Sequence, residues 1–360
     1  MKYNLKTYWW SDPCVRYVYN FGDLITPLLL QHYSKDINII PTQSDKAAIY
    51  GVGSLIPAIS PERFSVLLGC GSLAEKRVEL PNALVYALRG ELSKKMLNIN
   101  EQITLGDPGL LIPYVLPAKD MINNNLSKPI GIIPHFKQYA NQRIDSFRNH
   151  PNYKIINVRA EAECVIRDIC SCSSIISSSL HGLIIADAYK IPNIRLVFED
   201  NLFDVNDFKF LDYFSSIKRC GKSATSITPE QITSKIEYNN EYFANIDSVQ
   251  KALDTTFKKF VSDLPLIQLI VSIDDLIRKA DFYRAKNALN LTRIVTIAKK
   301  STDYSDTIRK IVRDSDLGAS LKKRLWYYRI MSKITNETKR AHYKKHKGIL
   351  KQLIRSLNAF

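Results

Sequence analysis

Short apolar runs recur along residues 1–235, and this pattern constrains the fold more than any other feature. Eight of the runs are strand candidates, and most of them are short, continuous and apolar, as expected for strands buried on both faces of a parallel sheet. They are residues 47–52, 64–68, 84–88, 103–105, 130–133, 154–158, 174–177 and 194–198. Amphipathic stretches with helical periodicity separate them. The sequence therefore predicts an α/β protein whose ligands bind beyond the carboxyl ends of its strands.

A polar, Asn-rich stretch at residues 117–128 interrupts this alternation and is typical of a linker between domains. It divides the α/β part into two units of similar size, residues 1–116 and 117–235. From residue 236 the spacing of apolar residues becomes helical, over residues 247–261, 266–289, 290–300 and 306–312. We therefore predict a third, all-helical segment over residues 236–360.

The chain is basic, with 51 Lys and Arg residues, 35 Asp and Glu residues and a net charge of +16. Residues 241–360 hold 25 of the basic and 12 of the acidic residues, so the basicity belongs mainly to the C-terminal third. Residues 320–360 combine 12 Lys and Arg with Trp326, Tyr327 and Tyr328. This combination predicts contact with an anionic membrane surface, with a solvated helical face as the alternative. No nucleic-acid-binding motif is present, so nucleic acid is not an expected partner.

The six cysteines, at positions 14, 70, 164, 170, 172 and 220, follow no zinc-ligand spacing, so we expect no metal site. In a chain of this length they are typical of reduced thiols, which predicts a cytoplasmic protein. The first residues lack the apolar stretch and the cleavage site of a signal peptide. No run approaches the ~20 apolar residues that span a bilayer, so membrane contact is expected to be peripheral.

Two motifs in the first unit carry groups that can act on a ligand. Asn20, Gly22 and Asp23 precede an expected helix, where Asp23 or Thr26 can cap the helix or the helix N-terminus can attract an anion. Arg89 directly follows the run 84–88, and its planar guanidinium suits a carboxylate or a phosphate. A surface salt bridge is the alternative role for Arg89.

Two motifs in the second unit, and one turn before it, complete the candidate site. The sharpest signal is the helix-start loop formed by Ser177, Ser178, Ser179, Leu180, His181 and Gly182. Its hydroxyl groups and helix N-terminus predict an anion pocket, and His181 can exchange protons near neutral pH. His135 and Lys137 follow the run 130–133 and add a second imidazole and a positive charge. Asp107 can bind a sugar hydroxyl or shape a turn, and we favour the turn.

Seven motifs occur together in a fixed order and resemble those of the polysaccharide pyruvyl transferase family over about residues 15–220. They are NFGD at 20–23, Gly-x-Gly-Ser after a strand, Arg89 followed by Ser93, GDPGLL at 106–111, IPHF at 133–136, SSSLHGLIIADAYKIP at 177–192 and KF-x-DY at 209–213. The resemblance implies a GT-B-like fold, in which two Rossmann-like domains face each other across a cleft. It also implies phosphoenolpyruvate as the donor, without a cofactor or metal. The acceptor would be a sugar of lipopolysaccharide, capsule, wall polymer or a polyprenyl-diphosphate-linked precursor, which receives a pyruvate ketal.

The resemblance assigns roles residue by residue. His181 matches the family's proposed catalytic acid/base, and Arg89 matches the arginine that grips the donor. Many members have an arginine two residues before this histidine, whereas the present chain has Ser179. Lys137, Arg195 or Lys209 can supply that cation instead. The remaining residues of the loop at 177–182 and His135 are predicted donor ligands, while the residues predicted to bind the acceptor or to be structural are Asn20, Asp23, Asp107 and Lys209.

Three other functions stay open at this point. A glycosyltransferase that uses a nucleotide sugar has the same expected fold. A nucleic-acid-binding protein is also basic, although here the charge is concentrated toward the C-terminus. A non-catalytic member of the family is the third alternative, because of Ser179. The sequence does not name the acceptor sugar, the position and stereochemistry of the ketal or the oligomeric state.

Overall fold

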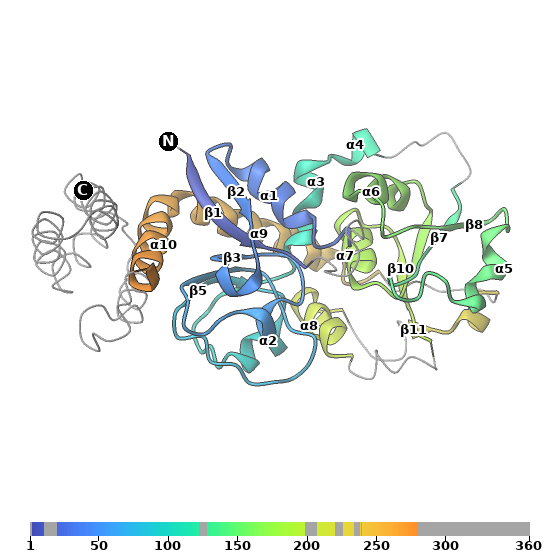
Figure 1. The fold of residues 1–360 in the computed structure, drawn as a ribbon. Coiled ribbons are helices and arrows are strands. Elements are labelled where there is room, and N and C mark those ends of the chain that lie inside the picture. The colour runs from blue at the N-terminus through green and yellow to red at the C-terminus, as the bar shows by residue number, and fades with distance from the viewer. Residues whose placement is uncertain are drawn as a thin grey trace, which may run out of the picture. The chain divides into compact units, whose positions relative to one another are not determined.

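The computed structural model of the chain describes residues 2–10, 20–121, 128–198, 207–219, 226–233, 238 and 240–279. Its contacts group residues 1–262 into one compact unit and residues 263–360 into a second. Within the first unit the described strands form two separate parallel sheets (Figure 1). The α/β class with parallel sheets is therefore as predicted.

The first sheet has six strands in the order β2-β1-β3-β4-β5-β6, and every pairing in it is parallel. The strands are β1 (Tyr3–Tyr8), β2 (Ile37–Pro41), β3 (Ile49–Tyr50), β4 (Ser65–Leu68), β5 (Ala83–Leu88) and β6 (Thr104–Leu105). All residues of β3 and β4 are buried, as continuous apolar runs predict for central parallel strands.

The second sheet has five strands in the order β11-β10-β9-β7-β8, again all parallel. They are β7 (Ile130–Ile133), β8 (Tyr153–Ile155), β9 (Ser174–Ser177), β10 (Asn193–Leu196) and β11 (Ser226–Ile227). Strand β9 is buried along its whole length between β10 and β7. Its carboxyl end therefore opens in the middle of the sheet edge, where the loop at 177–182 begins.

Helices connect the strands, as parallel pairing requires. The α-helices are α1 (Ile25–Tyr33), α2 (Glu91–Met96), α3 (Ile112–Val115), α4 (Ala118–Met121), α5 (Asp145–Arg148), α6 (Ala162–Cys170), α7 (Leu180–Ala188), α8 (Phe208–Ile217), α9 (Phe243–Ser262) and α10 (Leu264–Lys279). The short 3₁₀ helices are η1 (Ser44–Lys46), η2 (Ile56–Ala58), η3 (Pro108–Leu111), η4 (Gln142–Ile144) and η5 (Pro229–Thr233).

We call the part of the first unit that carries the first sheet its first half and the part that carries the second sheet its second half. Helix α7 is buried on every side, because it packs against β9 and β10 and also against η3 of the first half. A helix that is apolar all round, as in this LHGLIIADA segment, has to be buried in this way. The fit to η3 is tight. A Cβ atom on Gly109 would lie 2.8 Å from Cγ2 of Ile184.

Two helices join the two halves of the first unit. Helix α8 lies between β10 and β11 of the second sheet in the chain but packs on α2 of the first half. Helix α9 buries Leu253 and Phe260, and it packs against β5, β6, η3, α7 and α8. Its buried Gln250 donates hydrogen bonds to the carbonyl oxygens of Leu110 and Ala188, at 2.8 and 3.3 Å. These contacts explain why residues 1–262 cluster as one unit.

All eight predicted strands are present, with shifted ends, and the helix predicted at 247–261 is α9. Three strands went unpredicted, namely β1, β2 and β11. In β1 only Leu5 and Thr7 are buried, because Lys6 and the flanking polar residues alternate with them. Strand β2 is an edge strand that ends in Pro41, which such a position tolerates. Short or half-polar strands of this kind have weak sequence signals.

The division of the α/β part at residue 116 and the all-helical character of residues 236–360 remain predictions. Helix α10 is the part of the second unit that the structure describes, and the helices predicted at 290–300 and 306–312 lie outside the described residues. So does the basic segment 320–360, with its predicted membrane contact. None of the helices in the described ranges is long and apolar enough to cross a bilayer.

Candidate active site

A cavity of about 510 Å³ lies at the carboxyl ends of the strands, as predicted for a parallel α/β fold. Both halves of the first unit contribute to it. The first half supplies Tyr8, Trp10, Asn20, Asp23, Ser54, Leu55, Pro57, Ala58 and Leu73, and the second half supplies His135, Phe136, Lys137, Gln138, Ser179, Leu180, His181 and Lys209.

His181 lies in the first turn of α7 and reaches the cavity, although its side chain is only 8% exposed. Its Nε2 atom has no hydrogen-bond partner among the described residues. Burial, with smaller contributions from the positive charges of Arg89 and Lys209 and from nearby His135, lowers the pKa of His181 to about 3. The imidazole is therefore neutral at physiological pH.

Gly22 explains how the imidazole reaches its position. A Cβ atom at residue 22 would lie 1.9 Å from Nδ1 of His181, so only glycine lets the ring lie against the backbone. The ring of Phe21 meets the imidazole edge-on, with centroids 6.3 Å apart. The NFGD motif and the loop that carries His181 are thus in direct contact, although 159 positions separate Gly22 from His181 in the sequence.

The serines of the predicted anion pocket divide into two groups. Ser177 and Ser178 are buried within the loop, where the Ser177 hydroxyl accepts the Ser179 N–H at 3.0 Å and the Ser178 hydroxyl donates to Oε1 of Gln138 at 2.6 Å. Gly182 packs against the Ser177 hydroxyl, since a Cβ there would lie 2.4 Å from it. The residues of this loop that line the cavity are Ser179, Leu180 and His181.

The positive charge of the cavity comes from the second half of the unit. Lys137 and Lys209 both line it, on the β7 loop and in the first turn of α8. Burial lowers the pKa of His135 to about 3, and the charges of Lys209 and Lys137 add to the effect. Arg195, the third candidate cation, pairs with Asp207 at 2.6 Å and is absent from the lining. Two ammonium groups therefore face the cavity beside two neutral imidazoles.

The predicted side-chain cap of α1 is wrong. The helix begins after Leu24 without a capping side chain, and the Thr26 hydroxyl instead accepts the backbone N–H of Val52 at 2.8 Å. Asp23 accepts a hydrogen bond from the Asn20 amide at 2.5 Å and lines the cavity. Burial raises the pKa of Asp23 to about 8, so this carboxyl group is mostly protonated at neutral pH.

Asp107 shapes a turn, as favoured from the sequence. Its Oδ1 accepts the Gly109 N–H at 2.9 Å and caps η3, and the residue does not line the cavity. Its other oxygen, Oδ2, is buried without a hydrogen-bond partner among the described residues. Burial raises the pKa of Asp107 to about 6.

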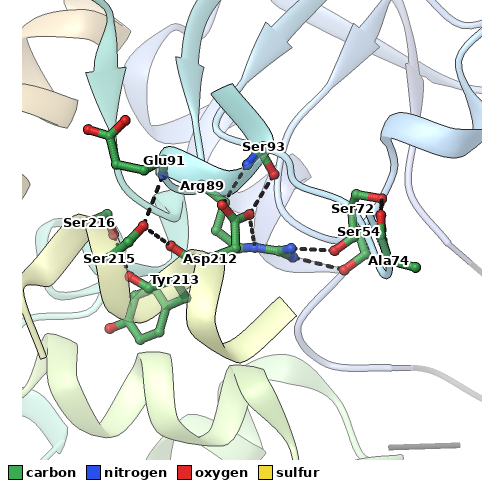
Figure 2. A network of polar contacts seen from close by, with 10 residues as sticks. All are labelled: Ser54, Ser72, Ala74, Arg89, Glu91, Ser93, Asp212, Tyr213, Ser215 and Ser216. Atoms are coloured by element: carbon green, nitrogen blue, oxygen red, sulfur yellow. Dashed lines mark hydrogen bonds and ion pairs between the residues drawn. The ribbon is translucent and has the colours of Figure 1, made fainter. Parts of the chain in front are cut away.

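Arg89 occupies the end of β5, as predicted, but its guanidinium is only 1% exposed and does not line the cavity. Figure 2 shows its contacts. Nε pairs with Asp212 of α8 at 3.0 Å, Nη1 donates to the Ser54 hydroxyl at 2.8 Å and Nη2 donates to the Ser72 carbonyl. Asp212 also accepts the N–H and the hydroxyl of Ser93. Direct contact between Arg89 and a donor remains a prediction, because the structure shows the guanidinium engaged by protein groups.

Several residues that line the cavity were not singled out from the sequence. Tyr8 and Trp10 come from the end of the unpredicted strand β1, and Ser54 and Leu55 follow β3. The aromatic run at residues 8–10 was the available signal for the first pair. Within the described ranges, no group of three or more His, Cys, Asp or Glu side chains is placed to hold a metal ion.

The low pKa of His181 predicts a pH-dependent contribution to stability. The folded pKa of about 3 lies below the ordinary value of 6.5, so the unfolded chain binds this proton more tightly. The neutral His181 therefore contributes its full stability above pH 6.5, the pKa in the unfolded chain. This stability is lost as the pH falls toward 3, the pKa in the folded protein. Between pH 7.5 and 5.5 we expect the His181→Gln variant to gain about 1.4 kcal/mol of unfolding free energy relative to the wild type, measured by urea unfolding. A constant difference across this range would contradict a neutral buried imidazole.

Comparison with models of protein families tests the family resemblance that the sequence motifs indicated. The family model described as polysaccharide pyruvyl transferase matches residues 20–199, which is half of the 360-residue chain. The chain belongs to the polysaccharide pyruvyl transferase family. The match includes the loops that carry Gly22, His135 and His181, whereas Trp10 and Lys209 lie outside it.

Two relatives of this family member extend the comparison. Uncharacterized protein L143 of Acanthamoeba polyphaga mimivirus is 29% identical over 174 residues, which cover 46% of the present chain and 58% of the relative. Succinoglycan biosynthesis protein ExoV of Rhizobium meliloti (strain 1021) is 23% identical over 133 residues, which cover 37% of the chain and 40% of the relative. The similarity thus spans about half the length of these relatives. No solved structure matches the chain significantly.

Proposed function

We propose that the protein transfers the pyruvyl group of phosphoenolpyruvate to two hydroxyl groups of a sugar in a cell-surface glycan or its lipid-linked precursor. The observation that carries this proposal is His181 beside two lysines in one cavity, a buried imidazole whose Nε2 has no hydrogen-bond partner in the described part of the chain. Family membership supports the transfer chemistry. The role in the name of ExoV, succinoglycan biosynthesis, supports a polysaccharide acceptor.

The donor is a small anion that matches the charge of the cavity. Phosphoenolpyruvate carries a phosphate of about −1.5 to −2 charges and a carboxylate. The ammonium groups of Lys137 and Lys209 provide two positive charges, and lysine is a common phosphate ligand. The N-terminus of α7 adds backbone N–H groups near Ser179. In this proposal the lysines supply the cations that the missing arginine at position 179 would have contributed.

The transfer has two bond-forming steps. One acceptor hydroxyl attacks C2 of the enol, its proton leaves to a base, and a proton is added to C3, which becomes a methyl group. The resulting C2 carries the phosphate, the carboxylate and one sugar oxygen. The second hydroxyl then attacks C2, the C–O bond to phosphate breaks, and inorganic phosphate leaves with the second proton taken up by phosphate or a base. The product is a cyclic pyruvate ketal.

His181 supplies the proton for C3 in this scheme. The imidazole is neutral in the empty cavity, because it is buried next to positive charges. A bound donor anion neutralises these charges and favours the imidazolium, which raises the pKa of His181. Protonation of the acid is then coupled to donor binding. General acid catalysis of this kind typically contributes 10²–10⁴-fold to the rate.

The arrangement of the two sheets as a GT-B fold and a location at the inner face of the membrane belong to the same proposal. A cavity lined from both halves of the first unit supports a cleft between two facing domains. The membrane contact depends on residues 320–360, which lie outside the described residues. Removal of this segment is expected to reduce binding to anionic liposomes if the segment serves this role.

Phosphate release tests the proposed function directly. The full-length protein is incubated with phosphoenolpyruvate and a panel of lipid-linked sugars, and phosphate and the mass of the glycan are measured. We expect phosphate release that depends on the acceptor, with a pyruvyl group retained on the sugar. Binding of nucleotide sugars in place of phosphoenolpyruvate would instead support a glycosyltransferase.

The variant Lys209→Gln tests whether this lysine binds the donor. Removing an ammonium group from the cavity is expected to raise the KM for phosphoenolpyruvate about tenfold, equivalent to about 1.4 kcal/mol, while the KM for the acceptor changes little. Lys258→Gln is the control, because Lys258 lies on α9, is 68% exposed and does not line the cavity. Equal donor KM values for the two variants would exclude Lys209 from donor binding.

A further inference from the structure

The two sides of the cavity differ in chemistry. Every Lys and His residue in its lining comes from the second half of the unit. The side formed by the first half is mainly aromatic and aliphatic, with Tyr8, Trp10, Leu55, Pro57 and Leu73, and its polar groups belong to Asn20, Asp23 and Ser54. Leu73 keeps 57% of its surface exposed at the edge of this side. The cavity therefore has a cationic side and an apolar side.

Trp10 lies where the two sides meet. It follows the carboxyl end of β1, and its ring lies 5.2 Å from the ring of Phe136, tilted by 40°. Phe136 stands next to His135 and Lys137 on the cationic side. Trp10 is only half buried, so part of a large aromatic surface stays available to a ligand. Aromatic faces carry negative charge density that attracts weakly positive C–H groups, such as those on the apolar face of a pyranose ring.

The polar groups beside Trp10 suit hydroxyl groups better than charges. Asp23 and Asn20 line the cavity, and they are joined by a hydrogen bond. Tyr8 lines the cavity as well, and burial together with the charge of Asp23 raises the pKa of its hydroxyl group. A protonated carboxyl group, an amide and a phenol each offer a donor and an acceptor, which matches a pair of sugar hydroxyls.

We propose that the apolar side is the acceptor subsite and that the acceptor is an uncharged hexopyranoside, which stacks on Trp10 and presents its hydroxyl pair to Asp23 and Asn20. This inference rests on the proposed function, because it assumes that the donor occupies the cationic side. Bound phosphoenolpyruvate, with a charge between about −2.5 and −3, exceeds the two positive charges of Lys137 and Lys209. The two lysines among the described lining residues would then leave the further negative charge of an acidic sugar without compensation.

The neighbouring tryptophan provides a matched control. Trp9 and Trp10 are adjacent and both half buried, but Trp9 does not line the cavity. The full-length variants Trp10→Ala, Trp10→Phe and Trp9→Ala are compared at saturating phosphoenolpyruvate. The probes are p-nitrophenyl β-D-glucopyranoside, β-D-galactopyranoside, β-D-mannopyranoside and β-D-glucuronide. We expect Trp10→Ala to raise the acceptor KM at least tenfold, Trp10→Phe to raise it less, and Trp9→Ala to change it less than twofold.

Two further measurements separate the acceptor from the donor. The Kd for phosphoenolpyruvate is expected to stay within twofold in Trp10→Ala, and the glucuronide should have a kcat/KM at least tenfold below that of the best neutral glycoside. Saturation-transfer NMR with the methyl hexopyranosides reads binding without turnover, and we expect the signal to be lost in Trp10→Ala and retained in Trp9→Ala.

The outcomes distinguish failure of the acceptor subsite from failure of the proposed function. Equal acceptor KM values and equal NMR signals for Trp10→Ala and Trp9→Ala would overturn the acceptor subsite, as would preference for the glucuronide. Absence of an NMR signal for all the neutral glycosides would overturn it as well. Failure of the wild type to bind phosphoenolpyruvate or to release phosphate from it would refute the proposed function instead.

Discussion

Replacing Arg89 with alanine is expected to lower the free energy of unfolding by about 3–5 kcal/mol, because it leaves the buried Asp212 carboxylate unpaired. Both side chains are almost fully buried, at 1% and 0% exposure, so water does not compensate the lost charge. The variant also removes hydrogen bonds to Ser54 and to the Ser72 carbonyl. Urea unfolding of the full chain, followed by fluorescence, measures the effect.

The same experiment separates two roles of Arg89. Helix α8 carries both Asp212 and the cavity residue Lys209, so the ion pair anchors a helix that contributes to the site. An Arg89→Met, Asp212→Leu double variant is expected to recover much of the stability, since replacing a whole buried ion pair is often nearly neutral. If Arg89→Ala left stability intact and only weakened binding of phosphoenolpyruvate, Arg89 would be a donor ligand, as the family resemblance implies.

An exposed ion pair serves as the control for this prediction. Arg148 pairs with Asp145 at 2.7 Å on the surface, with 31% and 54% of the two side chains exposed. Surface pairs of this kind contribute about 0–1 kcal/mol, because water screens both charges. Arg148→Ala should therefore change the unfolding free energy by at most about 1 kcal/mol. A loss as large as that of Arg89→Ala would show that burial is not the cause.

The second large effect is expected for His181→Ala, which should lower kcat about 10²–10⁴-fold if this imidazole protonates C3 of the donor. The reason is geometric as well as chemical. Of the two histidines that line the cavity, His181 lies at the N-terminus of α7 and has a buried Nε2 without a hydrogen-bond partner in the ranges that the structure describes. Initial rates of phosphate release at saturating donor and acceptor measure the loss. The plot of kcat against pH should also lose the decrease at high pH that results from deprotonation of the catalytic acid.

His150→Ala is the matched control, because His150 is exposed and does not line the cavity. Its kcat is expected to remain within twofold of the wild type. Unfolding measurements on His181→Ala and His181→Gln separate lost chemistry from lost packing against Gly22 and Phe21. Near-normal turnover in a folded His181→Gln variant would remove His181 from the mechanism.

Most of the strands that were predicted correctly contain a short apolar run in a buried part of a sheet, although β6 and β8 are only half buried. Strand β9 and the loop after it illustrate this, because SIIS followed by serines and a helix start has few alternative structures. Strand β1 lacks this property, since its residues alternate between buried and exposed positions. Because β1 was not predicted, Tyr8 and Trp10 were not recognised as candidate site residues, although both belong to the proposed acceptor subsite.

The candidate residues were placed at the correct ends of their strands, but their partners could not be deduced. Arg89 had a surface salt bridge as one alternative, whereas the structure pairs it in a buried position with Asp212, 123 positions later. The expected cap by Asp23 failed because the buried carboxyl group pairs with Asn20 instead. Pairing of side chains that lie far apart in the sequence depends on how the elements pack, which local patterns do not encode.

The sequence by itself determined the α/β class, the ordered motifs of the family and the histidine loop at the start of α7, because local periodicity and turn chemistry carry this information. Only the tertiary structure decided which groups face the cavity and which are buried against protein. Lys209 and Trp10 reach it, while Arg89 and Ser177 do not. The physical reason is that a buried charge or hydroxyl must find a partner, and packing between segments distant in the chain determines which partner that is.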